Sequence, residues 1–590
     1  MPKKRYLVLV LGLLLMLSGV VLAAGTQSGF GSVAVSQVDF QAADGSLIHA
    51  TLQRPVYATD TDPLPGVVVI HGSLQNKEWL MAFGIELSQR GFVVLTIDAN
   101  GHGNSEPGSG SGTAALNYIA ALDYVDDSQI GLIGHSMGGG ISWRAIDDSP
   151  VTVRSLVLVG SGFWETPPYI PNTLVAVGNF DSLSSYPSNL TKLEPYFGVT
   201  DIELGVVYGD FANNTARMII APSTNHLFET IDPVIVSEST EWMKNSLKGG
   251  MEDEHWFASS SLTYPLWLAG GFLSLLGILL TSFPVIAILL DTPVFSMLKG
   301  GPKHYERAST GALISYGLIY GVIGAATFFP FLLVGSLLSL FIPFPQYNGI
   351  PVMSWMLGSG LLSALVLAII LRVRTTRKLQ TTEEDGVIVQ QQIDKEREGL
   401  GSVLGITGGL ERWIGTLLRT LVLSLIAVAW LYAWTVVVDI GFALDFRVFL
   451  PGLHDLTLLQ FGMTPLYFIV FLVYFLVEGG WFTSVMLTAE KDSWTKTQVY
   501  WTVKAILIKT IPYLILIAIE FGGGFLAGSA VIPGIIGYSW LFFYAFTPWF
   551  AIATVFTMFG YRVTGNRWLG AIMNALIHAW LLASILSFRG

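Results

Sequence analysis

The chain has 590 residues, too many for one ordinary domain, and its 52% hydrophobic and 12% charged residues are unlike those of a soluble protein. The formal net charge of −11, without a basic patch in the globular part, excludes a typical nucleic-acid binder, which gathers lysine and arginine on one face. Because cysteine is absent, disulfides, thiolate metal sites and a cysteine nucleophile are excluded as well.

A basic N-terminus precedes the first apolar segment. Lys3, Lys4 and Arg5 are followed by an uninterrupted apolar run over residues 6–24. Residues 1–25 are therefore expected to be a signal peptide or a transmembrane anchor. The apolar core of a cleavable signal is usually roughly 7 to 15 residues long, so this longer run favours a retained helix. Either form exports the sequence that follows.

Residues 32–248 are expected to form a globular domain, because turns and charges interrupt short apolar runs there. Four runs rich in Val, Ile and Leu are typical of buried parallel strands: residues 66–70, 92–97, 130–133 and 155–159. Residues 77–90 and 137–147 have helical spacing. This alternation predicts a three-layer α/β sandwich with a mostly parallel sheet, whose strand ends meet at one edge.

The stretch Gly134-His135-Ser136-Met137-Gly138 follows the third run and matches the G-x-S-x-G turn that holds a catalytic serine. The turn lifts the hydroxyl above the strand end, and the N-terminal amides of the next helix face charge that develops on the substrate. The flanking glycines make room for the sharp turn. A serine hydrolase is therefore the leading hypothesis.

Two other segments accompany the serine turn. His71-Gly72-Ser73 follows the first run, and residues 98–105 read Asp-Ala-Asn-Gly-His-Gly-Asn-Ser. Together these motifs resemble the α/β-hydrolase family over about residues 35–247. In that family the first motif lies in the oxyanion loop, and the second, D-x-R-G-x-G-x-S, is structural; here Asn100 replaces the usual arginine. The resemblance implies an α/β-hydrolase fold with an esterase-like or lipase-like activity.

A serine nucleophile needs a base to take its proton and a carboxylate to orient that base. In the fold that the resemblance implies, these follow the chain order serine, acid, histidine. Residues 174–177 and 218–221 are expected to be the last two strands, with Asp181 after the first and His226 after the second. We therefore assign Ser136 as nucleophile, Asp181 as orienting acid and His226 as general base.

Other residues of the same types compete for these roles, but they lie in family structural motifs or in a polar stretch before the last strand. The competitors are His71, His102, His135, Asp201 and Asp210. The oxyanion is expected to be held by the backbone N–H groups of Met137 and Ser73, with Leu74 as a substitute. Triad chemistry needs no metal or organic cofactor, and none is expected.

The segment 162–171 is the cap expected between the strand after the nucleophile and the acid strand. Its larger side chains either line an apolar acyl pocket or pack under a short loop. They are Phe163, Trp164, Pro167, Pro168 and Tyr169. A short cap predicts an open site. Because the linker 249–261 is too short to carry the domain far from lipid, a small-molecule or lipid ester is the expected substrate, with membrane lipids as partners.

Residues 262–590 consist of long apolar runs separated by short polar ones, which predicts an all-α, multi-span transmembrane domain. The expected spans are 264–290, 311–342, 351–371, 417–438, 463–487, 503–520, 538–560 and 568–587. Residues 379–412 are expected to be a cytoplasmic linker or short surface helix. The stretch 521–538, with the run Gly522-Gly523-Gly524 and Pro533, is compatible with a re-entrant segment or one more span.

The charges of the loops orient this domain. With the N-terminus inside, sixteen lysines and arginines fall in the expected cytoplasmic loops, and only Arg447 and Arg589 fall in the outer segments. This is a strong positive-inside bias. We therefore expect a multi-pass protein of the cell membrane whose hydrolase domain is extracytoplasmic.

Three polar residues fall inside expected spans, where such groups are functional candidates. Glu478 lies in the fifth of the eight spans, and Asn574 and His578 lie in the last. For these residues the alternatives are pairing with one another, binding of a proton and binding of a metal ion. The set bears a faint resemblance to CAAX-protease-like intramembrane metalloproteases, whose paired glutamates and other histidine are missing, so hydrogen bonding between helices is the default. Lys504 and Lys509 are expected to snorkel to the inner face.

The leading hypothesis is a membrane-anchored, extracytoplasmic serine hydrolase that cleaves esters, thioesters or amides through an acyl-enzyme. A second hypothesis places the main function in the membrane, as a transporter or lipid-handling module that the hydrolase domain serves, because eight spans exceed what anchoring requires. A third is a peptidase or acyltransferase with the same triad, which the sequence does not separate from a hydrolase. The oligomeric state is not readable from the sequence.

Overall fold

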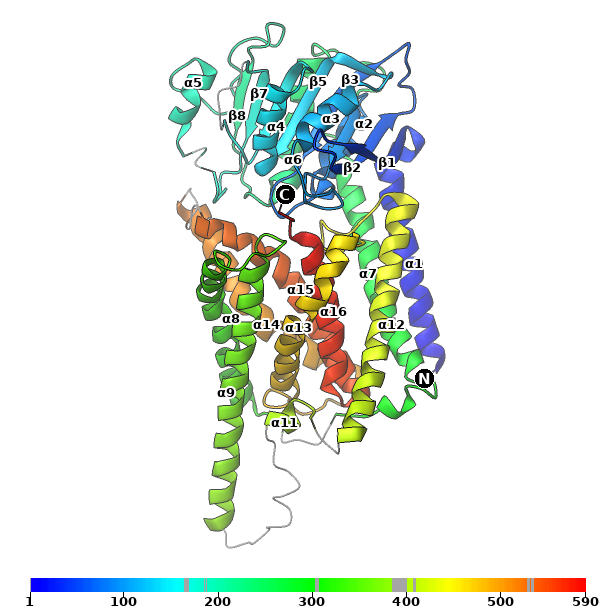
Figure 1. Cartoon of the computed structure of the whole chain (residues 1–590), viewed down its shortest axis with the longest axis vertical. Coiled ribbons are helices and arrows are strands. Elements are labelled where there is room, and N and C mark those ends of the chain that lie inside the picture. Colours follow the sequence, from blue (N-terminus) through cyan, green and yellow to red (C-terminus); the bar gives the residue numbers. More distant parts are fainter. Residues whose placement is uncertain are drawn as a thin grey trace.

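The structure is a computed structural model that describes residues 2–163, 169–184, 186, 188–302, 307–384, 400–406, 410–527, 531 and 535–589. A sheet-containing domain stands on one end of a bundle of long helices (Figure 1). The C-terminal segment reaches the junction between the two, and the N-terminus lies towards the opposite end of the bundle (Figure 1).

One eight-stranded sheet forms the core of the N-terminal domain. Its strands are β1 (Val33–Gln41), β2 (Leu47–Pro55), β3 (Leu64–Ile70), β4 (Val93–Ile97), β5 (Val125–His135), β6 (Val153–Val159), β7 (Asn172–Ala176) and β8 (Arg217–Ile220). Their order across the sheet is β1-β2-β4-β3-β5-β6-β7-β8, with the first two pairs antiparallel and all others parallel. The mostly parallel sheet expected from the sequence is confirmed, and the predicted runs fall on β3 to β8.

Helices cover both faces of this sheet. They are α2 (Met81–Ser88), α3 (Ser111–Ala120), α4 (Met137–Asp148) and α6 (Pro233–Leu247). In β3, Val67 packs in one core with α2 and α6, whereas its neighbour Val68 packs in a second core with α3 and α4. Successive residues of a strand point to opposite faces, so one apolar run supplies both cores. The domain is therefore a three-layer α/β sandwich.

Nine helices in the described part of the chain are long and apolar enough to cross a membrane. They are α1 (Pro2–Gln27), α7 (Tyr264–Leu289), α8 (Thr310–Leu338), α9 (Gly349–Glu384), α12 (Leu410–Phe442), α13 (Leu458–Thr483), α14 (Trp494–Ala527), α15 (Ile535–Thr564) and α16 (Arg567–Ile585). The last eight fall on the eight segments expected after the globular domain. By the length and composition of its helices, this is a multi-pass membrane protein.

The glycine-rich stretch at the end of α14 belongs to that helix. α14 continues to Ala527, so within the described residues Gly522, Gly523 and Gly524 form no re-entrant segment. Residues 528–530 and 532–534 lie outside the described residues, and so do residues 385–399 of the expected cytoplasmic linker.

Helix α1 packs along α7 through glycines of both helices. A Cβ added at Gly19 would overlap the backbone of Gly270, and one added at Gly277 would overlap the backbone of Met16. Small residues permit two helix backbones to approach this closely.

A buried cluster of charges joins the sheet domain to the loop between α12 and α13. Nη2 of Arg447 lies 2.6 Å from Oε2 of Glu78 and 2.6 Å from Oδ2 of Asp445. Lys77 also pairs with Glu78, and the Lys77 N–H donates a 2.8 Å hydrogen bond to Asp98. All five side chains are less than a tenth exposed. Buried charges are tolerated only when they are paired, so the domain and the loop depend on each other.

The charge cluster shifts the pKa values of its acidic side chains. Burial raises the pKa of Asp445 to about 7, despite the neighbouring Arg447. Burial also acts to raise the pKa of Glu78, but Arg447 and Lys77 together lower it to about 2. Glu78 is therefore an ionised partner of Arg447 at neutral pH.

Two further hydrogen bonds hold the domain on the bundle. The Gln460 side chain at the start of α13 donates to the Gly103 carbonyl (2.7 Å), and the Phe588 N–H donates to the Gly101 carbonyl (2.9 Å). Both acceptors lie in the segment 98–105 that follows β4. Its contacts show that this motif supports the domain junction.

Gly277→Leu is expected to lower the melting temperature of the detergent-solubilised protein by several degrees, because a branched side chain does not fit between the α1 and α7 backbones; overpacking of this kind costs about 1–3 kcal/mol. Gly462→Leu in α13 is the matched control, since a Cβ there meets open space. Thermal unfolding followed by tryptophan fluorescence makes the comparison. Equal melting temperatures for the two variants would contradict the α1–α7 packing.

Candidate active site

Ser136 occupies a sharp turn between β5 and α4. Its φ of 51° and ψ of −115° are a strained combination for a residue with a side chain. The Ser136 N–H donates a 2.9 Å hydrogen bond to the Val159 carbonyl of β6, which fixes the turn against the sheet. The strand-to-helix geometry presents the hydroxyl at the carboxyl edge of the sheet, as the G-x-S-x-G pattern predicts.

The two glycines of the motif are required by close approaches. A Cβ at Gly134 would overlap the carbonyl of Gly138, and a Cβ at Gly138 would overlap the carbonyl of Ile70 at the end of β3. Backbones therefore pass too closely on both sides of Ser136 for any other residue. The strain at Ser136 is held in place by this packing.

The predicted acid and base lie together. Nδ1 of His226 is 2.9 Å from Oδ2 of Asp181, and both side chains are buried to about 95%. Asp181 follows β7, and its other oxygen accepts hydrogen bonds from the N–H groups of Leu183 (2.7 Å) and Ser184 (3.2 Å). These bonds fix the carboxylate, which in turn fixes the imidazole.

Ser136 and His226 line the same cavity. Within the described residues no hydrogen bond joins the Ser136 hydroxyl to the His226 ring. Ser73 and Leu74 also line the cavity, and Leu74 has a φ of 59°. Met137 is the first residue of α4, so its N–H is one of the amides that a helix N-terminus leaves without an intrahelical partner.

The competing histidines have other partners. His71 is fully buried, and its Nε2 accepts a 3.0 Å hydrogen bond from the Ala99 N–H. Burial lowers the pKa of His71 to about 4, so this ring is neutral at pH 7. His102 Nδ1 lies 3.0 Å from the Asn100 carbonyl oxygen. Both rings make hydrogen bonds to backbone groups of the structural motif at residues 98–105.

The competing aspartates lie on the surface. Asp201 and Asp210 are exposed, and Asp210 accepts a 3.1 Å hydrogen bond from the Asn213 N–H within its own turn. Neither lines the cavity of Ser136.

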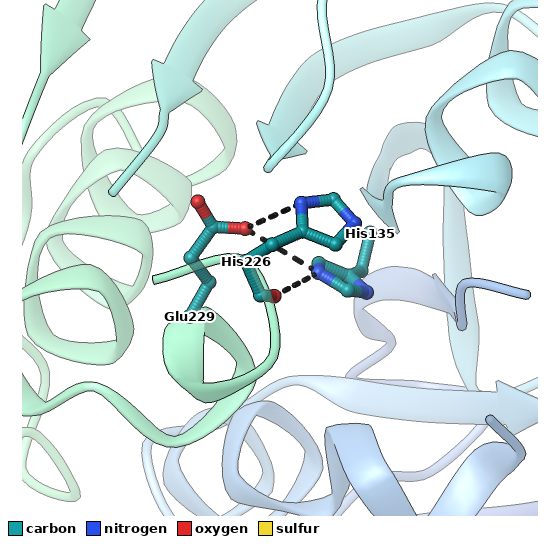
Figure 2. Close-up of side chains that lie close together, drawn as sticks. All are labelled: His135, His226 and Glu229. Atoms are coloured by element: carbon teal, nitrogen blue, oxygen red, sulfur yellow. Dashed lines mark hydrogen bonds and ion pairs between the residues drawn. The ribbon is translucent and has the colours of Figure 1, made fainter. Parts of the chain in front are cut away.

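Glu229 is a buried carboxylate beside the imidazole that the sequence analysis missed. It lies in the turn after His226, and its Oε2 is 3.5 Å from His226 Nδ1 and 3.4 Å from His135 Nε2 (Figure 2). Its other oxygen accepts a 2.6 Å hydrogen bond from the Gly178 N–H. Burial and the neighbouring Asp181 carboxylate raise the pKa of Glu229 well above its ordinary value. Its position three residues after a histidine was the only signal in the sequence.

His135, His226 and Glu229 form a group with the spacing of metal ligands (Figure 2). However, both nitrogens of the His135 ring have hydrogen-bond partners: Nε2 lies 3.0 Å from the His226 carbonyl oxygen, and Nδ1 lies 2.7 Å from Oε1 of Gln75. His226 Nδ1 is likewise engaged by Asp181. This donor set fits a hydrogen-bonded support for the His226 loop better than a metal site.

The cavity above Ser136 has a volume of about 210 Å³ and lies between the two parts of the chain. Its lining from the membrane part is Val448, Phe449, Pro451, Phe542, Tyr544, Ala545 and Ile585. The expectation of an open site was therefore wrong, because the helix bundle supplies a cover that the short cap does not. Phe163 and Tyr169 instead pack against the core of the sheet domain, and Trp164, Pro167 and Pro168 lie outside the described residues.

Of the polar residues singled out in the spans, Glu478 and Asn574 make contacts between helices, whereas His578 Nδ1 lies 2.8 Å from the Asn574 carbonyl oxygen of its own helix. Lys509 does not snorkel, because its Nζ lies 2.6 Å from Oε2 of Glu478 and both side chains are 1% exposed. Tyr320 donates a 2.7 Å hydrogen bond to the same oxygen. The Asn574 amide donates to the Ala553 carbonyl (2.8 Å) on the neighbouring helix. The ion pair between α13 and α14 was not predicted, since the sequence does not show which helices are neighbours.

A family profile matches the part of the chain that contains the nucleophile turn. Residues 61–197 match the family described as serine aminopeptidase, S33 (Hydrolase_4). This range covers β3 to β7 and ends before His226. The N-terminal half of the chain carries an α/β-hydrolase domain. The long apolar helices that follow it form the membrane part of the molecule.

Curated relatives of this α/β-hydrolase domain include esterases. Bis(hydroxyethyl) terephthalate hydrolase of Streptomyces coelicolor is 26% identical over 200 residues, covering 33% of this chain and 60% of that protein. Lipase 1 of a Moraxella species is 29% identical over 146 residues, covering 24% and 45%. An uncharacterized protein of Mycobacterium tuberculosis is 32% identical over 101 residues, covering 17% and 29%. The chain spans less than two thirds of each of these relatives.

Glu229→Gln is expected to raise stability at neutral pH. The folded protein raises the pKa of Glu229, so folding is disfavoured increasingly as pH rises above the carboxyl pKa of the unfolded chain, about 4.3, until the folded-state pKa is passed. Glutamine does not ionise. The variant should match the parent near pH 4 and exceed its stability by a growing margin as the pH rises to 8.

Melting temperatures at pH 4, 6 and 8 test this expectation, with Glu203→Gln, an exposed carboxylate of the same domain, as control. A Glu229→Gln variant whose stability follows the same pH dependence as the parent would show that Glu229 is not held neutral.

Proposed function

We propose that this chain is a membrane-anchored serine hydrolase that cleaves esters through an acyl-enzyme, with Ser136 as nucleophile, His226 as general base and Asp181 as orienting acid. The observation that supports it best is the 2.9 Å hydrogen bond between Asp181 and His226, whose ring lines the same cavity as the strained Ser136. A buried carboxylate that fixes the tautomer of an imidazole beside a serine is the arrangement that activates a hydroxyl.

In the first half of the reaction, Oγ of Ser136 attacks the ester carbonyl carbon while Nε2 of His226 takes the hydroxyl proton. The carbonyl electron pair moves to oxygen. When the tetrahedral intermediate collapses, the C–O bond to the alcohol breaks and Nε2 returns the proton to the leaving oxygen. Water repeats the sequence on the acyl-enzyme and releases the acid, which restores Ser136.

The negative oxygen of the intermediate needs donors on the Ser136 side of the cavity. The N–H of Met137 at the start of α4 is one, and the N–H of Ser73 or Leu74 in the loop after β3 is the other. The positive φ of Leu74 supports this choice, because it bends the loop backbone where it borders the cavity.

Glu229 serves this machinery as a positioning residue. Held neutral by burial and by Asp181, it places no second full charge beside the imidazole, and it ties the His226 loop to the Gly178 backbone at the end of β7. Asp181 then remains the carboxylate that stabilises the imidazolium formed during proton transfer.

The hydrolase domain is proposed to face the outside of the cell. The Arg447–Glu78 pair and the hydrogen bond from Phe588 to Gly101 hold Arg447 and Arg589 at the end of the bundle that carries the hydrolase domain. Among the described basic residues, Arg5 and Lys299 both pair with Asp291, near the N-terminus at the other end. Because cytoplasmic loops are enriched in lysine and arginine, the hydrolase end is the outer one.

Ser136→Ala is expected to lower kcat/KM for p-nitrophenyl esters by roughly 10³-fold or more, since loss of the nucleophile removes the acyl-enzyme route. Labelling of the full chain by a fluorophosphonate probe should disappear in the same variant. Ser128→Ala, at the exposed start of the same strand β5, is the control and should retain both. A Ser136→Ala protein that hydrolyses esters at the parent rate would overturn the proposed function.

The absence of cysteine permits a direct test of orientation. Single substitutions Glu203→Cys in the hydrolase domain and Asp492→Cys between α13 and α14 place one thiol at each end of the molecule, both at exposed positions. A membrane-impermeant maleimide should label the first in intact cells and the second only after permeabilisation. The reverse pattern would place the hydrolase domain inside.

A further inference from the structure

The wall of the active-site cavity opposite Ser136 belongs to the membrane part of the chain. Val448, Phe449 and Pro451 come from the loop after α12, Phe542 and Tyr544 from α15, and Ile585 from α16. The loop after α12 precedes the two helices in the chain, and each of the three elements has one end at the side of the bundle that carries the hydrolase domain (Figure 1). The sheet domain alone therefore makes only half of the cavity.

The two halves differ in chemistry. The hydrolase half presents the polar groups of Ser73, Gln75, His135, Ser136 and His226 together with apolar side chains, whereas the membrane half presents only apolar and aromatic side chains. The apolar residues of the hydrolase half are Leu74, Trp79, Leu183, Leu227 and Phe228. A cavity that is polar around the reacting atoms and apolar opposite them suits an ester group with a hydrocarbon chain attached. A small polar ester would leave the apolar wall uncovered.

The edge of the cavity continues into an exposed aromatic surface. Phe228, which lines the cavity, is 41% exposed, and its ring lies 5.9 Å from that of Tyr544. The Tyr544 ring lies 5.7 Å from that of Phe521 in α14. Phe525, one turn further along α14, is 70% exposed and lies 6.0 Å from Phe180 of the hydrolase domain.

This aromatic edge sits where a candidate span ends. α14 finishes at Ala527, so Phe521 and Phe525 occupy its last two turns, and the neighbouring Leu526 is 87% exposed. Aromatic side chains concentrate at the level of lipid headgroups, and large exposed apolar patches mark surfaces that meet lipid or ligand. The cavity edge at Phe228 and Tyr544 therefore lies beside the end of a candidate span.

We propose that the substrate is a lipid ester drawn from the leaflet next to the hydrolase domain, with its acyl chain against the membrane half of the cavity and its ester carbonyl at Ser136. The chain would pass the edge formed by Phe228 and Tyr544 and lie against Phe449, Phe542 and Ile585. This inference rests on the proposed function. In it the helix bundle selects the substrate and also anchors the hydrolase domain.

The inference is tested with the full chain in phosphatidylcholine vesicles. The two probes are p-nitrophenyl butyrate, added from water, and 4-methylumbelliferyl palmitate, incorporated in the bilayer. The parent protein should have a kcat/KM at least tenfold higher for the palmitate ester. A protein that hydrolyses the butyrate and leaves the palmitate ester intact would overturn the inference.

Two variants test which part of the cavity determines the preference for the palmitate ester. Val448→Trp fills the membrane half of the cavity and should reduce the ratio of palmitate to butyrate kcat/KM at least tenfold. Phe228→Ser removes the apolar edge at a half-exposed position and should reduce the same ratio at least threefold. Leu204→Ser is the control, an equally exposed apolar residue of the hydrolase domain outside the cavity, and should leave the ratio unchanged.

Fluorophosphonate labelling of Ser136 distinguishes failure of the lipid-ester inference from failure of the proposed function. It also reports whether each variant is folded. If Ser136 is labelled in all proteins but the ratio does not respond to Val448→Trp or Phe228→Ser, the lipid-ester inference fails while the serine hydrolase stands. If Ser136 is not labelled in the parent protein, both fail.

Discussion

The contact of Arg447 with Glu78 and Asp445 is the interaction on which the arrangement of this molecule depends. These side chains are buried, and Arg447 pairs with one acid from the loop and one from the hydrolase domain, so the loop between α12 and α13 is held firmly on the hydrolase domain. The residues that follow Arg447 in this loop, Val448 and Phe449, line the cavity of Ser136. Docking of the two parts and completion of the cavity are therefore one event, and a change that loosens the ion pairs also opens the site.

Around Ser136, close packing and hydrogen bonds fix the positions of the candidate catalytic residues. Close backbone approaches at Gly134 and Gly138 hold the serine in a strained conformation. The sheet edge brings Asp181 beside His226, 45 residues further along the chain, and His226 lines the same cavity as Ser136. Glu229 lies behind the imidazole, and burial and the neighbouring Asp181 carboxylate raise its pKa well above its ordinary value. The site thus holds two carboxyl groups beside one histidine.

The sequence predicted what depends on local pattern. Runs such as 66–70 and 130–133 became buried strands because they supply both cores of a covered sheet, and the long apolar runs became helices of spanning length. The strands β1 and β2 escaped notice because they mix polar and apolar residues at the edge of the sheet, where β1 is largely exposed. Glu229, the Lys509–Glu478 pair and the cavity wall at Phe449 and Phe542 were not predictable, since each depends on contacts between segments whose proximity no local pattern reveals.

We therefore regard the candidate active site as formed jointly by the α/β-hydrolase domain and the helix bundle. The most direct measurement is a cryo-electron microscopy structure of the full chain in a lipid nanodisc after reaction with a long-chain alkyl fluorophosphonate. We predict phosphorus bonded to Oγ of Ser136, with the alkyl chain against Phe449 and Phe542 and the Arg447–Glu78 pair intact. Phosphorus on another residue, or an alkyl chain directed away from the helix bundle over the surface of the sheet domain, would contradict the account.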